Sequence, residues 1–290
     1  MQKSGSKINE FWQTAKRKIS FRKKTLVMAI LNVTPDSFSD GGNFFLIDDA
    51  LRQVEKFVAE GADILDIGGE STRPNSARVS AEEEIERVAP MIEAISNRFD
   101  IPISIDTSKA EVAESAINAG AEIINDISGL RFDERIAEVA AKHQTGLVLM
   151  HLCGTFDTMH KLYPSEDILR EVSDGFRWSI EKAGSYGVKN QNIALDVGIG
   201  FSKTFAQNLE LIAELNKLGE EFADFPMLVG VSRKSFIGKI LDDAPVSERL
   251  NGTLAANAIA VWNGANIVRV HDVKATKETL KIVEEIRKKL

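Results

Sequence analysis

Eight short apolar runs recur along most of this chain, and a stretch with the spacing of an amphipathic helix follows each of them. The runs occupy residues 26–31, 63–69, 102–106, 122–127, 146–151, 192–198, 226–232 and 266–272. After the first run, Leu51, Val54, Phe57 and Val58 fall on one helical face. Eight strand–helix units within about 250 residues are the pattern of a closed (β/α)8 TIM barrel, so an α/β fold of that class is predicted.

A doubly wound open sheet is the alternative for such an alternation. That fold usually carries the glycine-rich fingerprint G-x-G-x-x-G after its first strand. The glycine pairs at 41–42 and 68–69 lack this spacing. We therefore expect one barrel domain over residues 25–290.

Two of the expected helices carry the S-x-x-E spacing of a capping box at their start. Ser80 and Glu83 form the first pair, and Ser108 and Glu111 form the second. The spacing predicts that each serine side chain caps its helix.

The first 24 residues are basic and weakly amphipathic. A targeting peptide is one interpretation, but Glu10 and the lack of a long apolar core count against secretion. We prefer an N-terminal hairpin or arm, over residues 1–24, that plugs one end of the barrel. The residues expected to pack inward are Phe11, Trp12, Ile19 and Phe21.

Composition and charge exclude several classes of protein. No apolar run approaches the roughly 18 residues that a membrane span needs, so no membrane partner is expected. Cys153 is the only cysteine, so no internal disulfide can form and a cytoplasmic location is expected. The net charge of −7 argues against a broad nucleic-acid surface.

Polar or otherwise distinctive side chains stand at the carboxyl end of nearly every expected strand. An aspartate in such a place is often only a helix cap. In a closed barrel, however, all these ends meet at one mouth, where barrel enzymes assemble their sites. The pattern therefore predicts a functional mouth, built from Asn32, Thr72, Arg73, Asp106, Asn125, Asp126, Met150, His151, Asp196, Ser232, Arg233, Lys234, Ser235, Arg269 and His271.

These residues divide by chemistry. Asp106, Asn125 and Asp196 can accept hydrogen bonds from a flat, guanine-like heterocycle. The ends of the seventh, eighth and first strands are neighbours and supply donors to an anion, namely Lys234, Arg269, His271 and Asn32.

Asn32 with Asp40 has the oxygen chemistry to ligate a hard cation such as Mg²⁺ beside that anion. Plainer interpretations remain for two of the residues, because Lys234 also suits a solvated helix start and Asp40 also suits a turn. His143 and His160 have no partner at metal-ligand spacing and are interpreted as structural or exposed.

Six segments together resemble the signature segments of the dihydropteroate synthase family. They are "MAILNVTPDSFSDGG", "DIGGESTRP", "ISIDTSK", "IINDISG", "VGVSRKSFIG" and "RVHDV". The resemblance runs in order over residues 25–290 and implies a single pterin-binding barrel domain. It also implies a transferase that condenses 6-hydroxymethyl-7,8-dihydropterin diphosphate with 4-aminobenzoate, yielding 7,8-dihydropteroate and diphosphate. Such an enzyme acts in folate biosynthesis, is a sulfonamide target and pairs as a homodimer.

The resemblance also implies roles for individual residues. The pterin would be held by Asp106, Asn125, Met150, Asp196 and Lys234. The diphosphate would be held by Asn32, Arg73, Arg269 and His271, with Mg²⁺ at Asn32 and Asp40. The pocket for 4-aminobenzoate or a sulfonamide would be lined by Phe38, Thr72, Arg73, Pro74, Phe201, Lys234 and Ser235. The catalytic set would be Asn32, Asp40, Arg73, Lys234, Arg269 and His271.

The chain departs from the family pattern after its sixth strand. The family usually reads close to DPGFGFGK, whereas residues 196–203 read DVGIGFSK. Val197, Ile199 and Ser202 are the unusual residues, and we expect them to reshape the 4-aminobenzoate pocket.

Two other functions remain open from the residues. A methyltetrahydrofolate methyltransferase would share the acceptor set but would not need the anion site of the SRKS and RVHD segments. A non-catalytic pterin-binding paralogue would be expected to lose residues of the first two loops, which are intact here. An assay with the diphosphate substrate separates all three functions.

Overall fold

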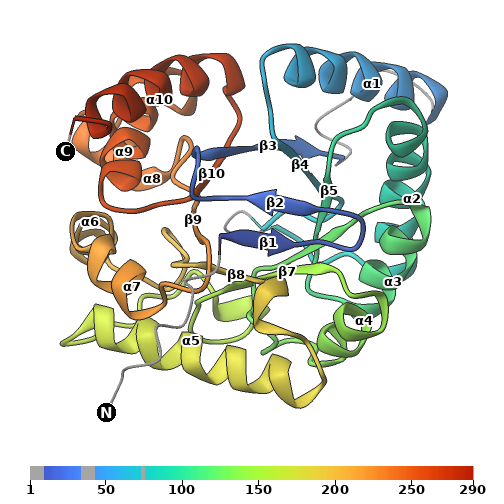
Figure 1. The fold of residues 1–290 in the computed structure, drawn as a ribbon, viewed down its shortest axis with the longest axis horizontal. Helices are drawn as coiled ribbons and strands as arrows, with labels where there is room; N and C mark the ends of the chain where they lie inside the picture. Colours follow the sequence, from blue (N-terminus) through green and yellow to red (C-terminus); the bar gives the residue numbers. More distant parts are fainter. Residues whose placement is uncertain (1–9, 34–42, 73–75, 290) are drawn as a thin grey trace.

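The computed structural model describes residues 10–33, 43–72 and 76–289. In this part of the chain, eight parallel strands close into a barrel in the order β10-β3-β4-β5-β6-β7-β8-β9 (Figure 1). The strands are β3 (Leu26–Asn32), β4 (Ile64–Gly68), β5 (Ile103–Asp106), β6 (Ile123–Asp126), β7 (Gly146–Met150), β8 (Ile193–Asp196), β9 (Met227–Val229) and β10 (Ile267–Val270). The predicted TIM barrel is confirmed.

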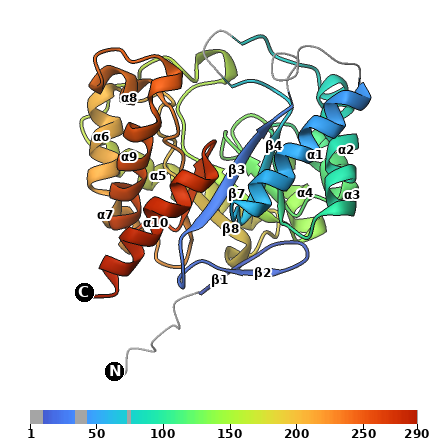
Figure 2. The same ribbon diagram turned by 90° about the horizontal axis from the view of Figure 1, so that it is seen from above.

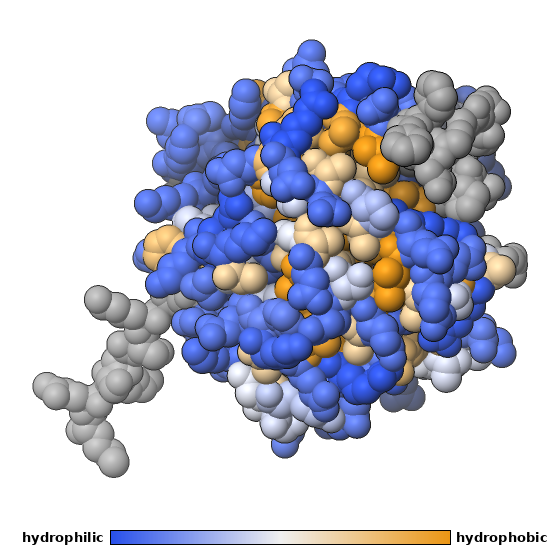
Figure 3. All heavy atoms as spheres, turned by 90° about the vertical axis from the view of Figure 1, so that its right-hand side faces the viewer, coloured by the Kyte–Doolittle hydropathy of each residue, from blue (hydrophilic) through white to orange (hydrophobic). Residues whose placement is uncertain are grey.

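Helices surround the barrel on its outer side (Figure 2). They are α1 (Asn43–Ala59), α2 (Ala81–Arg98), α3 (Ala110–Ala119), α4 (Arg135–His143), α5 (Ile168–Ser185), α6 (Phe205–Ala213), α7 (Leu215–Glu221), α8 (Ser235–Ile240), α9 (Leu250–Trp262) and α10 (Val273–Arg287). Figure 3 shows one side of this layer, where hydrophilic residues face outward and apolar residues lie in the recesses between them. Among the described helices, none is long and apolar enough to cross a membrane.

The strands have two buried faces, which explains their continuous apolar runs. Along β3, Val27, Ala29 and Leu31 pack outward in the main core against the helices. Leu26 and Met28 alternate with them and join a second cluster inside the barrel. Every side chain from Leu26 to Leu31 is therefore buried, and the polar residue of the strand, Asn32, stands only at its carboxyl end.

An antiparallel hairpin of β1 (Phe11–Gln13) and β2 (Lys18–Ser20) closes the amino end of the barrel, as expected. Trp12 is 0% exposed, packs in the inner cluster with Phe21, and donates from Nε1 to the Asn192 carbonyl oxygen at 2.8 Å. The prediction for Phe11 is wrong, because its side chain is 41% exposed. Neighbouring residues on a strand point to opposite faces, so Trp12 and Phe11 cannot both enter the barrel.

Replacing Trp12 by alanine is expected to lower the free energy of unfolding by about 3–5 kcal/mol, because it leaves a cavity in the inner cluster. Urea titration measures the change. Trp178→Ala is the matched control, since Trp178 on α5 is 43% exposed. A loss for Trp12→Ala no larger than the control's would show that the hairpin does not stabilise the barrel.

One of the two predicted serine caps is present. Ser80 caps α2, and its side chain accepts from the backbone N–H of Glu83. The prediction for Ser108 is wrong, because α3 begins at Ala110 and its cap position makes no side-chain hydrogen bond. The N–H of Ala110 instead donates to Asp133 Oδ2 at 2.9 Å, so a carboxylate from the next loop takes the place of the local cap.

Candidate active site

An arginine lies between two carboxylates inside the carboxyl end of the barrel. Arg269 on β10 donates from Nε to Asp66 Oδ2 at 2.5 Å and from Nη2 to Asp106 Oδ2 at 2.7 Å. Asn125 on β6 donates from Nδ2 to the same Asp66 oxygen at 3.1 Å. Four strands, β4, β5, β6 and β10, thereby bring one cation, two carboxylates and one amide into a single network.

Burial changes the acidity of this network. It raises the pKa of Asp106 to about 7, and the nearby Asp66 carboxylate adds to the rise while Arg269 opposes it. For Arg269, burial alone would lower the pKa, but Asp66 and Asp106 outweigh it and raise the pKa. Arg269 is therefore always charged, whereas Asp106 can gain or lose a proton near neutral pH.

Asp196 is held at the end of β8 by a tight backbone approach. Its Oδ1 accepts from the N–H of Gly198 at 2.7 Å, and burial raises the pKa of the carboxyl group. Gly198 has a φ of +69°, and a Cβ there would lie 2.0 Å from the carbonyl oxygen of His151. Only glycine can therefore occupy position 198, and it fixes the Asp196 carboxylate at the mouth.

Lys234 approaches the same part of the mouth from the loop after β9. Its Nζ donates to the Ile199 carbonyl oxygen and lies 4.5 Å from the centroid of the Phe201 ring. Burial lowers the pKa of Lys234 to about 8, partly offset by the charge of Asp196. Ser235 is exposed and begins α8, as the sequence predicts.

Asn32 lies beside the charged network. It pairs in register with Gly68 of β4, and a Cβ built on Gly68 would lie 3.9 Å from Asn32 Oδ1 and 3.8 Å from Asp106 Oδ2. Position 68 therefore lies next to both side-chain oxygens. His271 is at the end of β10, where its Nδ1 is 2.9 Å from Ser232 Oγ.

Met150 and Phe201 supply an apolar surface at the mouth. Met150 is buried at the end of β7 and clusters with Leu152, Phe156 and Met159, against which Phe201 packs. Thr72 lies after β4, and its carbonyl oxygen accepts from His160. Four of the predicted site residues lie outside the described residues, namely Phe38, Asp40, Arg73 and Pro74.

The unusual residues after β8 lie in different environments. Val197 and Ile199 do not line the mouth, because both side chains are 0% exposed and belong to the main core, so they could reshape the pocket only through packing. Ser202 has a φ of +51°, in the left-handed region that favours glycine. Its Oγ accepts from the Cys153 N–H at 2.7 Å, a bond that glycine could not make.

Sequence reasoning missed Asp66 and Lys203. Asp66 is a fully buried carboxylate in the middle of an apolar strand. A buried charge needs a partner, so an aspartate within an apolar run was the signal in the sequence. Lys203 is buried, and burial lowers its pKa to about 7. Its Nζ lies 3.1 Å from the His151 carbonyl oxygen, 3.2 Å from that of Phe201 and 3.2 Å from His151 Nδ1.

Side chains of His151, Cys153 and Glu171 come within 4.8 Å of one another, a set that resembles a metal site. However, Lys203 already contacts His151 Nδ1, and burial raises the pKa of the Cys153 thiol to about 11. The thiol lies 2.8 Å from Glu171 Oε1, to which it donates. We interpret this set as a hydrogen-bonded network, because the Cys153 thiol donates to Glu171 and the Lys203 ammonium lies against His151 Nδ1.

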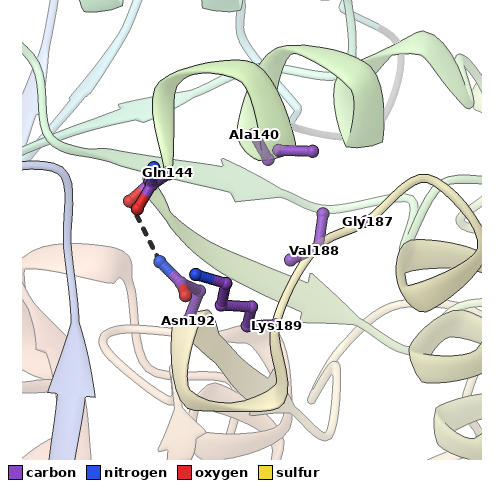
Figure 4. A pocket seen from close by; sticks show the side chains of 7 residues that line it. Ala140, Gln144, Gly187, Val188, Lys189 and Asn192 are labelled. Atoms are coloured by element: carbon purple, nitrogen blue, oxygen red, sulfur yellow. Dashed lines mark hydrogen bonds between the residues drawn. The ribbon is translucent and has the colours of Figure 1, made fainter.

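A small cavity of about 90 Å³ lies at the other end of the barrel. It is lined by residues that precede β7 and β8, among them Ala140, Val188 and Lys189 (Figure 4). Asn192 donates from Nδ2 to the Gln144 carbonyl oxygen there at 3.0 Å. This cavity is remote from the charged groups at the strands' carboxyl ends, so it is not part of the candidate active site.

The chain matches known proteins along most of its length. Residues 28–271 match the family described as "Pterin binding enzyme". Dihydropteroate synthase of Synechocystis sp. is 48% identical over 264 residues, which are 91% of each chain. Dihydropteroate synthase of Bacillus subtilis is 46% identical over 273 residues, which are 93% of this chain and 92% of the relative. These relatives decide against the methyltransferase alternative.

Solved structures agree with the sequence relatives. Dihydropteroate synthase of Clostridium difficile, determined in the presence of pteroic acid, has a TM-score of 0.85 and 44% identity, covering 91% of this chain and 97% of that one. The Yersinia pestis enzyme in a sulfonamide drug complex has a TM-score of 0.88 and 42% identity, covering 96% and 99%. The charged mouth and these similarities lead to one conclusion: the chain belongs to the dihydropteroate synthase family of pterin-binding enzymes.

Proposed function

We propose that the chain joins 6-hydroxymethyl-7,8-dihydropterin diphosphate to 4-aminobenzoate, releasing diphosphate and forming 7,8-dihydropteroate. The observation that carries this proposal is the convergence of Asp66, Asp106, Asn125 and Arg269 at one end of the barrel, with Asp196 and Lys234 at the same end. This arrangement offers acceptors for a flat heterocycle and a cation for an anion within one site.

The acceptors are proposed to hold the pterin. Asp196 uses Oδ1 for the Gly198 N–H, which leaves Oδ2 for ligand N–H groups. Asp106 and Asn125 supply further acceptors from the neighbouring strands β5 and β6, which pair in register at these two residues. Met150 provides an apolar contact for the ring, and the Lys234 ammonium provides a donor.

The diphosphate is proposed to bind at Arg269, His271, Asn32 and Arg73. Asn32 fits a magnesium ligand, because it is a hard oxygen donor at the strand end and its side chain has no hydrogen-bond partner among the described residues. Asp40 is proposed as its companion. A bound Mg²⁺ would neutralise charge on the diphosphate.

In the proposed reaction, the bond between the pterin methylene carbon and the diphosphate oxygen breaks first, and its electron pair leaves with the diphosphate. Arg269 and His271 stabilise the charge on this leaving group. The amine of 4-aminobenzoate then attacks the methylene carbon, and the protonated secondary amine that forms gives its proton to water. Its pocket is proposed to contain Thr72, Phe201, Lys234 and Ser235, together with Phe38, Arg73 and Pro74, and sulfonamides would occupy the same pocket.

A direct assay tests the proposed function. The purified protein is incubated with both substrates and Mg²⁺, and 7,8-dihydropteroate and diphosphate are measured. The proposal expects both products in equal amounts, formed only when 4-aminobenzoate is present. Absence of dihydropteroate from folded protein would overturn it, and that is the result expected of a non-catalytic paralogue.

Pterin affinity is expected to fall as the pH drops below about 7, because protonated Asp106 is a poorer acceptor for ligand N–H groups. The limiting slope is about tenfold per pH unit. Above about 7 the affinity levels off, and above about 8 it should fall again, because Lys234 loses its charge. Calorimetry with 6-hydroxymethylpterin measures the profile. Asp106→Asn should remove its acidic limb, and a flat profile in the unsubstituted protein would contradict the prediction.

We also propose a domain organisation, an oligomeric state and a cellular location for the chain. Residues 25–290 form one domain, with residues 1–24 as an arm packed on its amino end. Exposed apolar residues on α9 and α10 offer a face for a homodimer, namely Ile259, Trp262, Ile282 and Ile286. A single cysteine is consistent with work in the cytoplasm.

A further inference from the structure

His160 joins two loops that come from opposite parts of the barrel. Its Nε2 lies 2.7 Å from the carbonyl oxygen of Thr72, in the loop after β4. Its ring stacks on that of Phe201, in the loop after β8, with centroids 5.5 Å apart and planes at 26°. Both neighbours belong to the proposed 4-aminobenzoate pocket, and the sequence alone singled out His160 only as structural or exposed.

The backbone around His160 is fixed on the loop after β8. Ser202 donates from its backbone N–H to the Met159 carbonyl oxygen at 2.8 Å. Its own carbonyl oxygen accepts from the Tyr163 N–H at 3.1 Å. Ser202 Oγ accepts from the N–H of Cys153. One buried serine thus forms hydrogen bonds with the segment on both sides of His160. These bonds fix the position of the imidazole before a ligand binds.

The two contacts of His160 differ in kind. A carbonyl oxygen only accepts, so Nε2 carries the proton and donates to Thr72. The ring contact reaches Phe201, whose ring also lies 4.5 Å from Lys234 Nζ. His160 therefore fixes the backbone of one wall and the aromatic side chain of another, next to a proposed ligand-binding lysine.

We propose that His160 is a positioning residue for 4-aminobenzoate, which holds the loop at Thr72 against Phe201. The proposal rests on the proposed function, because it assigns 4-aminobenzoate to that pocket. A small ligand makes few contacts and cannot itself order two loops at little cost. Loss of His160 should therefore weaken 4-aminobenzoate binding, while the pterin end at Asp106 and Asn125 keeps its own contacts.

Three variants separate the two contacts. His160→Ala removes both and should raise the KM for 4-aminobenzoate about tenfold. His160→Gln keeps an N–H donor for Thr72, and His160→Phe keeps a ring for Phe201, so each should show a smaller rise of about threefold. In all three, the affinity for 6-hydroxymethylpterin, which lacks the diphosphate, should stay within about twofold of the unsubstituted protein's value.

His143→Gln is the matched control, because His143 on α4 pairs with Glu114 on α3 and has no part in the mouth. The affinity for a sulfonamide, measured with diphosphate and Mg²⁺ present, should fall in the variants whose 4-aminobenzoate KM rises. An unchanged 4-aminobenzoate KM in His160→Ala, or an equal loss of affinity for 6-hydroxymethylpterin, would overturn the proposal. Either result requires an active unsubstituted enzyme, whereas an inactive one would overturn the proposed function instead.

Discussion

Arg269→Ala is expected to reduce turnover of the diphosphate substrate by about 10²–10³-fold, because it removes the cation proposed to stabilise the leaving group. It is also expected to lower the free energy of unfolding by about 3–5 kcal/mol, since Asp66 and Asp106 lose their shared partner. Asp66 is fully buried, and its Oδ1 has no hydrogen-bond partner in the described part of the chain. Steady-state kinetics and urea titration measure the two effects.

A double variant separates the two roles of Arg269. Asp66→Asn/Arg269→Met removes a buried carboxylate together with the cation, so it should recover part of the stability and none of the turnover. If turnover returned with stability, Arg269 would support the barrel without binding the anion. A second control is the affinity for 6-hydroxymethylpterin, which lacks the diphosphate and should change much less than turnover does.

Asp196→Asn is expected to weaken pterin binding by about 10- to 100-fold, which corresponds to leaving a ligand donor opposite a protein donor. The asparagine oxygen can still accept from Gly198, so its amide nitrogen would face the ligand where Oδ2 stands now. The fold should survive, because the bond that fixes the loop is kept. Calorimetry with 6-hydroxymethylpterin gives the affinity.

Asp126→Asn is the control for this prediction. Asp126 is another fully buried carboxylate at a strand end, but its oxygens accept from Ser128 and from the N–H of Leu130. The Asp126→Asn variant should be less stable than the unsubstituted protein and should bind the pterin with unchanged affinity. Unchanged affinity in Asp196→Asn, or an equal loss in Asp126→Asn, would refute the assignment of Asp196 to the pterin.

The fold could be predicted because its signals are local and repeated. Eight apolar runs with helical spacing between them allow few architectures, and parallel strands with two buried faces explain those runs. The site was predicted through the same regularity, since residues at the carboxyl ends of parallel strands must share one mouth. Asp106, Asn125, Asp196 and Arg269 lie there for that reason.

The features that were missed depend on contacts between distant segments. Asp66 lies within an apolar run of the sequence. Its role as a partner of Arg269 is visible only in the fold, because Arg269 is on β10. His160 has no motif of its own, and Thr72 and Phe201 reach it from other loops. The prediction of the α3 cap failed for the same reason. Asp133, from the loop before α4, supplies the hydrogen-bond acceptor that Ser108 was expected to supply.

The hairpin at the amino end of the barrel has a practical consequence for anyone who engineers this enzyme. Trp12 and its neighbours lie at one end of the strands, whereas the charged mouth lies at the other. Substitutions that improve packing around the hairpin should therefore raise heat tolerance without altering drug sensitivity. Inhibitor screens can use such a thermally stabilised variant, because the residues at its mouth are those of the unmodified enzyme.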